Sequence, residues 1–278
     1  FNVGITNRGD LTRLVQEKAR SGVFLTALGF GMGNIKDATL EELTNKGNGN
    51  YYYIDSFSEA KKVLVDQKGG TLVTIAKDVK IQIEFNPGQV QSYRLIGYEN
   101  RMLAAQDFND DTKDAGEIGA GHTVTALYEI VPITLKKEQP DVDSLKYQTR
   151  VKPSKNKPVT QELLTVKLRY KQPNGDKSVK REFPLTDHKS KTKVPSLDFE
   201  WASAVAMYGL LLRDSKYAGQ ANLDLVRELA ASSRGTDPHG HRKEFLKMVY
   251  QSRALVARKL GQPIPAPRKF EAGKLDEK

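Results

Sequence analysis

The chain has 278 residues, which at roughly 150 residues per domain predicts about two domains. Its 44 lysines and arginines outnumber its 34 aspartates and glutamates, so the formal net charge is +10. Hydrophobic residues make up 38% of the sequence, which suits a globular protein and is too high for a disordered one. Cysteine is absent, and this excludes a disulfide framework, a thiolate zinc site and a cysteine nucleophile.

Residues 1–70 alternate helices with short apolar strands. We expect helices at residues 11–21, 38–46 and 56–67, and strands at residues 23–30 and 50–54. Asp10 and Ser56 are the N-caps expected for the first and third helices. Strands and helices that alternate with such short turns predict a parallel α/β sheet.

A glycine-rich turn follows the first of these strands. Gly29, Gly31 and Gly33 stand between a strand and a helix, as the glycines of a phosphate-binding loop do. The dinucleotide fingerprint needs a further glycine where Asn34 stands, and no Walker lysine–serine pair follows. We therefore interpret the segment as a flexible turn. Without a phosphate loop, a ribose contact by Asp55 has no support.

Two segments of this region resemble the C-terminal half of a bacterial von Willebrand factor type A domain: FNVGITNRGDL and VFLTALGFGMGNIKDATLEELTNKGNGNYYYIDSFSEAKKVL. The resemblance covers residues 1 to about 67. It is specific in the glycine-rich turn, the GNGNYYYID strand and the SEA helix. It implies a doubly wound parallel sheet below a metal-ion-dependent adhesion site, which is built from an Asp-x-Ser-x-Ser loop, a Thr and an Asp. In the family pattern all of these elements lie upstream of Phe1.

The resemblance therefore implies an incomplete site. Residues 1–5 would be the end of the fourth strand, and the half-sheet would expose an edge and a hydrophobic face. The missing N-terminal half, or a complementary chain, would supply the rest. Magnesium or another divalent cation would bind only if the full site is present, and we expect no cofactor within this chain. The residues that would border the site without holding the metal are Gly29, Gly31, Gly33, Asn34, Asp55 and Ser56.

From about residue 71 the hydrophobic period changes to that of half-buried strands. We expect strands at residues 79–85, 90–98, 121–133, 163–170 and 177–183, the last two joined by a Pro-Asn-Gly-Asp turn at residues 173–176. This pattern predicts a β-sandwich or a curled sheet within a β-rich domain at residues 71–195. The segment from YRLIGYENR to GHTVTALYEI resembles the domain of unknown function that follows the von Willebrand domain in the same bacterial group, which implies no activity.

Most of the excess charge lies in residues 136–195, which hold 16 basic and 7 acidic residues, a net charge of +9. Residues 136–158 mix Lys, Pro, Ser and Asn without apolar periodicity and predict a basic linker. Such a patch could bind nucleic acid, anionic lipid or acidic polysaccharide. No aromatic interleaving or nucleic-acid motif accompanies it, so we favour a solvated surface and expect no nucleic-acid partner.

An acidic turn precedes the third expected strand. Asp107, Asn109 and Asp111 occupy positions 1, 3 and 5 of a calcium-binding loop. The glycine of position 6 is replaced by Thr112, and the glutamate of position 12 by Ile118. We favour a solvated turn whose carboxylates pair with Lys113 or with the basic segment, and keep a calcium turn as the weaker alternative.

Residues 196–278 predict a helical region packed on the β-rich domain. We expect helices at residues 197–216, 223–232 and 241–260, and a flexible tail from about residue 262. Asp237, His239 and His241 lie close together at the start of the last helix. Zinc needs three or four converging ligands, so we favour a capped turn there.

The sequence holds no Ser-His-Asp arrangement, phosphate loop or metal-ligand spacing, and we expect no enzymatic activity. No apolar run reaches the roughly 18 residues of a membrane span, so we expect no transmembrane segment. The chain opens on Phe1 without a basic and then apolar leader, so we expect a processed product or a fragment.

The resemblance implies a non-catalytic protein-binding or adhesion/scaffolding protein of the bacterial cell envelope, with a protein as its ligand. Its ligand binding would be metal-dependent only if the N-terminal half is present, and a lipoprotein anchor would lie in that missing part. The alternative is an envelope structural protein attached electrostatically to anionic polymer or lipid through residues 136–195.

Overall fold

The structure is a computed structural model that describes residues 4–33, 35–98, 102–113, 115–133, 161–186 and 194–259. The chain forms two compact units. The first comprises Phe1–Ser92, Arg101–Val124 and Val131–Asp187, and the second comprises Tyr93–Asn100, Thr125–Ile130 and His188–Lys278. The expected basic linker at residues 136–158 and the tail from about residue 262 lie outside the described residues.

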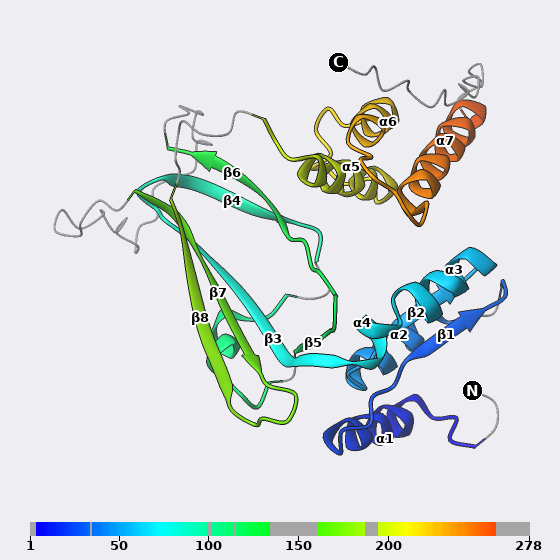
Figure 1. Cartoon of the computed structure of the whole chain (residues 1–278), viewed down its shortest axis with the longest axis vertical. Helices are drawn as coiled ribbons and strands as arrows, with labels where there is room; N and C mark the ends of the chain where they lie inside the picture. Colours follow the sequence, from blue (N-terminus) through cyan, green and yellow to red (C-terminus); the bar gives the residue numbers. More distant parts are fainter. Residues whose placement is uncertain are drawn as a thin grey trace, which may run out of the picture. The chain divides into compact units, whose positions relative to one another are not determined.

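The fold is mixed, with a small parallel sheet, a four-stranded antiparallel sheet and C-terminal helices (Figure 1). The first unit begins with α1 (Arg8–Arg20), β1 (Ala27–Phe30), α2 (Asp37–Lys46), β2 (Tyr51–Ile54), α3 (Phe57–Lys61), the π-helical turn η1 (Lys62–Asp66) and α4 (Lys68–Leu72). β1 and β2 pair in parallel, with Ala27 opposite Tyr51 and Phe30 opposite Ile54. The expected alternation and the parallel pairing are confirmed.

The first helix begins earlier than expected, and Asp10 is not its N-cap. The side chain of Asn7 accepts hydrogen bonds from the backbone N–H groups of Gly9 (2.8 Å) and Asp10 (3.2 Å). Asn and Asp cap helices about equally well, and Asn7 comes first in the chain. Asp10 therefore lies in the first turn, where it forms an ion pair with Arg13 (3.1 Å).

Two further elements differ from expectation. β1 covers only the second half of residues 23–30, because the turn after α2 crosses the chain at Leu25: a Cβ on Gly49 would lie 1.9 Å from the Leu25 carbonyl oxygen. The helix expected at residues 56–67 keeps its Ser56 cap but widens into η1, where the Gln67 N–H donates to the Lys62 carbonyl. No strand is present at residues 4 and 5, and residues 1–3 are not described.

The antiparallel sheet has the strand order β5-β3-β7-β8. Its strands are β3 (Thr74–Phe85), β5 (Gly116–Gly119), β7 (Glu162–Lys171) and β8 (Ser178–Thr186). The β7–β8 hairpin turns at the expected residues 173–176, where the Gly175 N–H donates to the Gln172 carbonyl (2.9 Å) and places Pro173 and Asn174 at the centre of the turn. Asp78 has a φ of +49° at an irregularity in β3, which is longer than the expected strand at residues 79–85.

The strand expected at residues 121–133 is confirmed only in its second half. β5 ends before it, Gly121 has a φ of +78° that favours glycine, and β6 (Leu127–Pro132) begins only six residues later. β6 pairs with β4 (Val90–Ile96) in a separate two-stranded sheet. Because a left-handed turn at Gly121 follows β5, residues 121–126 form no strand and only the second half of the expected strand joins a sheet.

In the second unit, α5 (Leu197–Leu212), α6 (Leu223–Ser232) and α7 (His241–Lys259) surround a buried core. The fully buried core side chains are Ala204, Val226, Ala230, Leu246 and Val249. The Phe245 ring meets Trp201 and Tyr208 edge-on at centroid distances of 5.3 and 5.4 Å, a favourable aromatic geometry. α5 ends earlier than expected because Asp214 turns into the left-handed region, with a φ of +49°.

The second half of β4 belongs to this helical unit. The Arg94 guanidinium lies 4.0 Å from the centre of the Tyr217 ring, in the segment after α5. It also forms an ion pair with Glu129 on β6. One arginine thus fixes the β4–β6 ribbon to the helices through a cation–π contact and a charge pair.

The turn before α7 is capped, as the sequence favours. The Asp237 carboxylate accepts hydrogen bonds from the backbone N–H groups of Arg242 (3.1 Å) and Lys243 (2.9 Å). Partial burial opposes ionisation, but these hydrogen bonds outweigh it and lower the pKa of Asp237. Among the described residues, no helix is both long and apolar enough to cross a bilayer.

β5 packs so closely on α4 that Gly119 has no room for a side chain. A Cβ there would lie 1.7 Å from the Gly70 carbonyl oxygen, whereas a Cβ on Gly116, in the same strand, would meet nothing within 4 Å. We expect Gly119→Ala to lower the free energy of unfolding by about 1–3 kcal/mol, and Gly116→Ala to change it by less than about 0.5 kcal/mol. Thermal unfolding followed by circular dichroism measures both, and equal effects would contradict this packing.

Candidate functional site

The candidate loop residues lie where β1 and β2 end. Gly31 and Gly33 follow β1 with φ angles of 91° and 98°, which favour glycine. Asp55 and Ser56 follow β2. The Tyr53 hydroxyl donates a hydrogen bond to the Gly31 carbonyl oxygen (2.7 Å), so the two loops lie at one edge of the sheet, as parallel pairing requires. Asn34 lies outside the described residues.

Gly29 lies within β1 rather than in the loop, and its role is packing. A Cβ at this position would lie 2.8 Å from the Tyr51 hydroxyl oxygen. That hydroxyl donates to the Asp37 carboxylate at the start of α2, and the carboxylate raises the pKa of Tyr51 to about 12. Gly29 therefore makes room for the contact that fixes α2 to the sheet.

The described residues of these loops show no cluster of metal ligands. The Ser56 hydroxyl accepts the Glu59 N–H (3.2 Å) as the cap of α3, so its oxygen is already used. Asp55 makes no hydrogen bond or ion pair within the described part of the chain. A magnesium site needs several oxygen ligands, and the described residues contain no group of three or more His, Asp or Glu placed to hold a metal ion.

Among the residues that the structure describes, no strand pairs with the outer edge of β1 beside these loops. The Ala27 N–H donates to the Asn50 carbonyl (2.9 Å), so residue 27 bonds toward β2. Since bonding direction alternates along a strand, the backbone groups of Leu28 and Phe30 point to the free edge of β1. Large apolar side chains are exposed nearby, with Phe30 at 61%, Met32 at 91% and Phe57 at 86% exposure. The surface around the strand ends is therefore apolar and has free backbone donors and acceptors.

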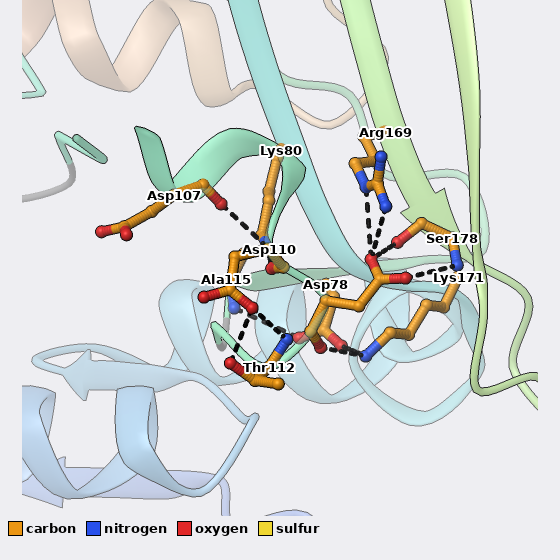
Figure 2. A network of polar contacts seen from close by, with 10 residues as sticks. Asp78, Lys80, Asp107, Asp110, Thr112, Ala115, Arg169, Lys171 and Ser178 are labelled. Atoms are coloured by element: carbon orange, nitrogen blue, oxygen red, sulfur yellow. Dashed lines mark hydrogen bonds and ion pairs between the residues drawn. The ribbon is translucent and has the colours of Figure 1, made fainter. Parts of the chain in front are cut away.

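A second candidate site, the acidic turn at residues 107–112, is a network of ion pairs (Figure 2). Arg169 on β7 donates to one Asp111 carboxylate oxygen through Nε (3.2 Å) and Nη2 (2.9 Å). The Ser178 hydroxyl on β8 donates to the same oxygen. The Ser178 and Arg169 hydrogen bonds lower the pKa of Asp111 to about 2. Asp111 thus attaches the turn to the β7–β8 hairpin.

Two lysines complete the attachment (Figure 2). Lys171 forms an ion pair with Asp78 (2.6 Å) and donates to the Asp111 carbonyl (2.9 Å). Lys80, only 3% exposed, donates to the carbonyls of Asp107 (3.4 Å) and Asp110. A buried ammonium group needs such partners, and here backbone oxygens of the turn provide them. These contacts join the acidic turn to β3 and β7. We call the contacts of Asp111, Lys171 and Lys80 the latch.

The calcium geometry is not assembled. In Figure 2 the Asp107 carboxylate points away from Arg169 and Ser178, the two residues that hold the Asp111 carboxylate. Asn109 is exposed at the end of the 3₁₀ turn η2 (Ala105–Asn109). The favoured expectation, that a carboxylate of this turn pairs with the basic segment, is confirmed by the Asp111–Arg169 pair.

Several basic side chains of residues 161–186 are used within the fold. Lys167 pairs with Glu84, and Lys180 pairs with Glu182 (2.6 Å). Together with Arg169 and Lys171, these lysines have acidic partners, so this part of the basic segment presents less free positive charge than its composition indicates.

Comparison with known proteins identifies the larger part of the chain. A family model described as "Uncharacterized protein YfbK, C-terminal" matches residues 70–255. This match spans more than half of the 278 residues. The chain belongs to the YfbK C-terminal family. The matched range contains the latch and the core of the helical unit.

Similarity extends beyond the family model. The chain is 41% identical over 249 residues to "Uncharacterized protein YfbK" of Escherichia coli (strain K12), a match that covers 90% of this chain and 42% of the relative. The chain therefore spans less than half the length of this relative. It is also similar to the crystal structure of the ArnB paralog VWA2 from Sulfolobus acidocaldarius, with 14% identity, a TM-score of 0.37, and coverage of 81% of this chain and 55% of that one. This degree of likeness assigns neither a fold nor a function.

Sequence reasoning did not find the partners of Asp111 in this YfbK C-terminal chain. Arg169 and Ser178 follow it by 58 and 67 residues, and no local motif joins them. The available signal was the pair of basic residues at alternate positions of β7, Lys167 and Arg169, which lie on one face of the strand and need acidic partners there.

The latch predicts a specific pH dependence. The pKa of Asp111 is about 2 in the folded protein and about 3.9 in an unfolded chain, so its contribution is fully present above about pH 4. It is lost as pH falls through the folded-state value. We expect Asp111→Asn to lower the melting temperature near pH 6 and to differ progressively less from the original protein toward pH 2.

Thermal unfolding between pH 6 and pH 2.5 measures this difference. Asp107→Asn is the matched control, because it removes a carboxylate from the same turn whose described contacts use the backbone carbonyl. It should leave the pH profile unchanged. A constant difference between Asp111→Asn and the original protein across the range would contradict the role of the ionised latch.

Proposed function

We propose that this chain is a non-catalytic protein-binding and scaffolding part of a bacterial cell-envelope protein, and that a strand from outside residues 1–278 completes its parallel sheet. The observation that carries the proposal is the free edge of β1 with exposed apolar side chains around it. A two-stranded sheet is marginal alone, and parallel sheets are normally covered on both faces.

The position of α1 supports β1 as the edge that is extended. α2 connects β1 to β2, and α1 contacts α2. In Figure 1, α1 lies beyond β1 on the side away from β2. In right-handed crossover connections, a helix that precedes a strand and lies on this side covers the groove to a further parallel strand. Leu14 of α1 is still 37% exposed, which is consistent with a missing neighbour.

The resemblance of residues 1–67 to a von Willebrand factor type A domain gives the missing strand a source, the N-terminal half of such a domain. The E. coli relative supports this indirectly, since 42% of its length is covered by this chain. In the completed domain the loops at Gly31–Gly33 and Asp55 would border a ligand site. Magnesium would have to be held by residues of the completing segment, because the described residues of these loops show no cluster of metal ligands.

The proposed completion can be tested in trans. The part of the E. coli relative outside the matched region would be produced separately and added to the full chain. We expect it to bind and to raise the melting temperature by several degrees, as a ligand that binds only the folded state does. Leu28→Pro should abolish binding, because proline introduces a ring and removes an N–H at the free edge of β1.

Tyr53→Pro is the matched control, because its backbone points to the other edge of the pair, on β2. It should leave binding intact, and circular dichroism would verify that both variants fold. Added magnesium should stabilise only the complex, reversibly on chelation. Failure of the segment to bind, or equal binding by Leu28→Pro, would overturn the proposed strand addition.

A further inference from the structure

The register of β3, β7 and β8 sorts their side chains onto two faces of very different chemistry. One face carries three cross-strand rows, which are Ile81–Leu168–Arg181, Ile83–Val166–Phe183 and Phe85–Leu164–Leu185. Tyr170 and Val179 continue the same face. Of these eleven positions, ten are apolar or aromatic and one is charged. The three strands therefore present a nearly continuous apolar face.

Most of the charged side chains of the opposite face form ion pairs. Its rows are Lys80–Arg169–Lys180, Gln82–Lys167–Glu182 and Glu84–Thr165–Pro184. Lys167 pairs with Glu84, Lys180 with Glu182, and Arg169 with Asp111. This face needs no partner.

Within the described part of the chain, this apolar face is half-buried at Ile83 and along β7, and exposed at Ile81 and along β8. Phe85, at the end of β3, is buried at 8% exposure. Along the sheet, Ile81 is 50% exposed, Phe183 51%, Leu185 52% and Val179 41%. Large apolar patches of this kind on a soluble surface mark interaction sites more often than chance, and antiparallel sheets normally cover one such face.

Arg181 gives the face a charge preference. It is the single charged residue in the three rows, and within the described part of the chain its guanidinium has no ion-pair or hydrogen-bond partner. Leu168 lies opposite it and Phe183 two residues away on the same face. A partner that buried this face would desolvate the guanidinium, and such a charge is costly unless a carboxylate accompanies it.

We propose that this face binds an amphipathic helix of a partner protein that carries a carboxylate within its apolar stripe, opposite Arg181. A helix is the element that packs most commonly on a sheet face, and its diameter of about 10 Å spans two to three strands at about 4.8 Å spacing. Successive rows of the sheet lie about 6.7 Å apart, close to the roughly 6 Å between helix positions i and i+4. An acidic residue one turn from a leucine would thus face Arg181 while the leucine contacts Phe183.

Two synthetic peptides test this directly on the full chain. Both are amphipathic helices of about 18 residues with a leucine stripe, and they differ only by glutamate or lysine in the middle of that stripe. Fluorescence anisotropy should give at least about tenfold tighter binding of the glutamate peptide. Arg181→Glu should reverse the preference, and Phe183→Ser should weaken both peptides.

Lys180→Glu is the matched control, since it reverses the adjacent charge on the opposite face and should leave the preference unchanged. Circular dichroism and thermal unfolding would verify that all variants fold. Equal affinity for the two peptides, or an unchanged preference in Arg181→Glu, would overturn the proposal. So would binding to phosphatidylglycerol vesicles that depends on Arg181 in the absence of peptide binding, because that result would assign the face to a membrane surface.

Discussion

Parallel sheets are normally buried on both faces and exposed strand edges are liable to pair further, yet among the described residues β1 is paired on one edge alone. Its bonds to β2 begin at Ala27, and no strand within the described residues lies beside the groups of Leu28 and Phe30 on the other edge. The positions of α1 and α2 can be understood from this condition of β1. α2 covers the pair through the contact of Tyr51 with Asp37, and α1 lies where a further strand would need cover. Exposed apolar side chains are expected around a sheet that has an unpaired edge.

The antiparallel sheet meets its requirements in a different way. Its backbone is paired across β5, β3, β7 and β8, and its polar face is neutralised by opposite charges from its own strands and from the acidic turn. Asp111 is central because one carboxylate receives Arg169 and Ser178 from two strands. Part of the positive charge of the basic segment therefore stabilises the fold by pairing with acidic side chains. The composition alone favoured a free basic surface, and the pairing reduces it.

Local features were predictable from sequence, and long-range ones were not. The Ser56 cap and the turn at residues 173–176 each depend on a few neighbouring residues, and each is where the sequence places it. Asp10 was misassigned because two good caps lie three residues apart and only packing decides between them. The split of residues 116–132 between two sheets depends on a left-handed glycine, which a strand pattern does not reveal. The loops at Gly31 and Asp55 lie at one edge of the sheet, since parallel pairing brings strand ends together.

The β1 edge and the apolar face of β3, β7 and β8 offer different groups to a partner. We therefore expect them to bind partners of different kinds. The β1 edge offers backbone groups, which bind another backbone regardless of its side chains, so its specificity must come from the apolar residues around it, such as Phe30 and Met32. The face of β3, β7 and β8 has no free backbone groups in its interior, and recognition there depends on side chains alone. A single guanidinium in such a face adds little affinity in water and strong discrimination once desolvated, because an unmatched buried charge is penalised more than a matched one is rewarded. Arg181 therefore acts mainly by excluding helices that lack an acid at that turn.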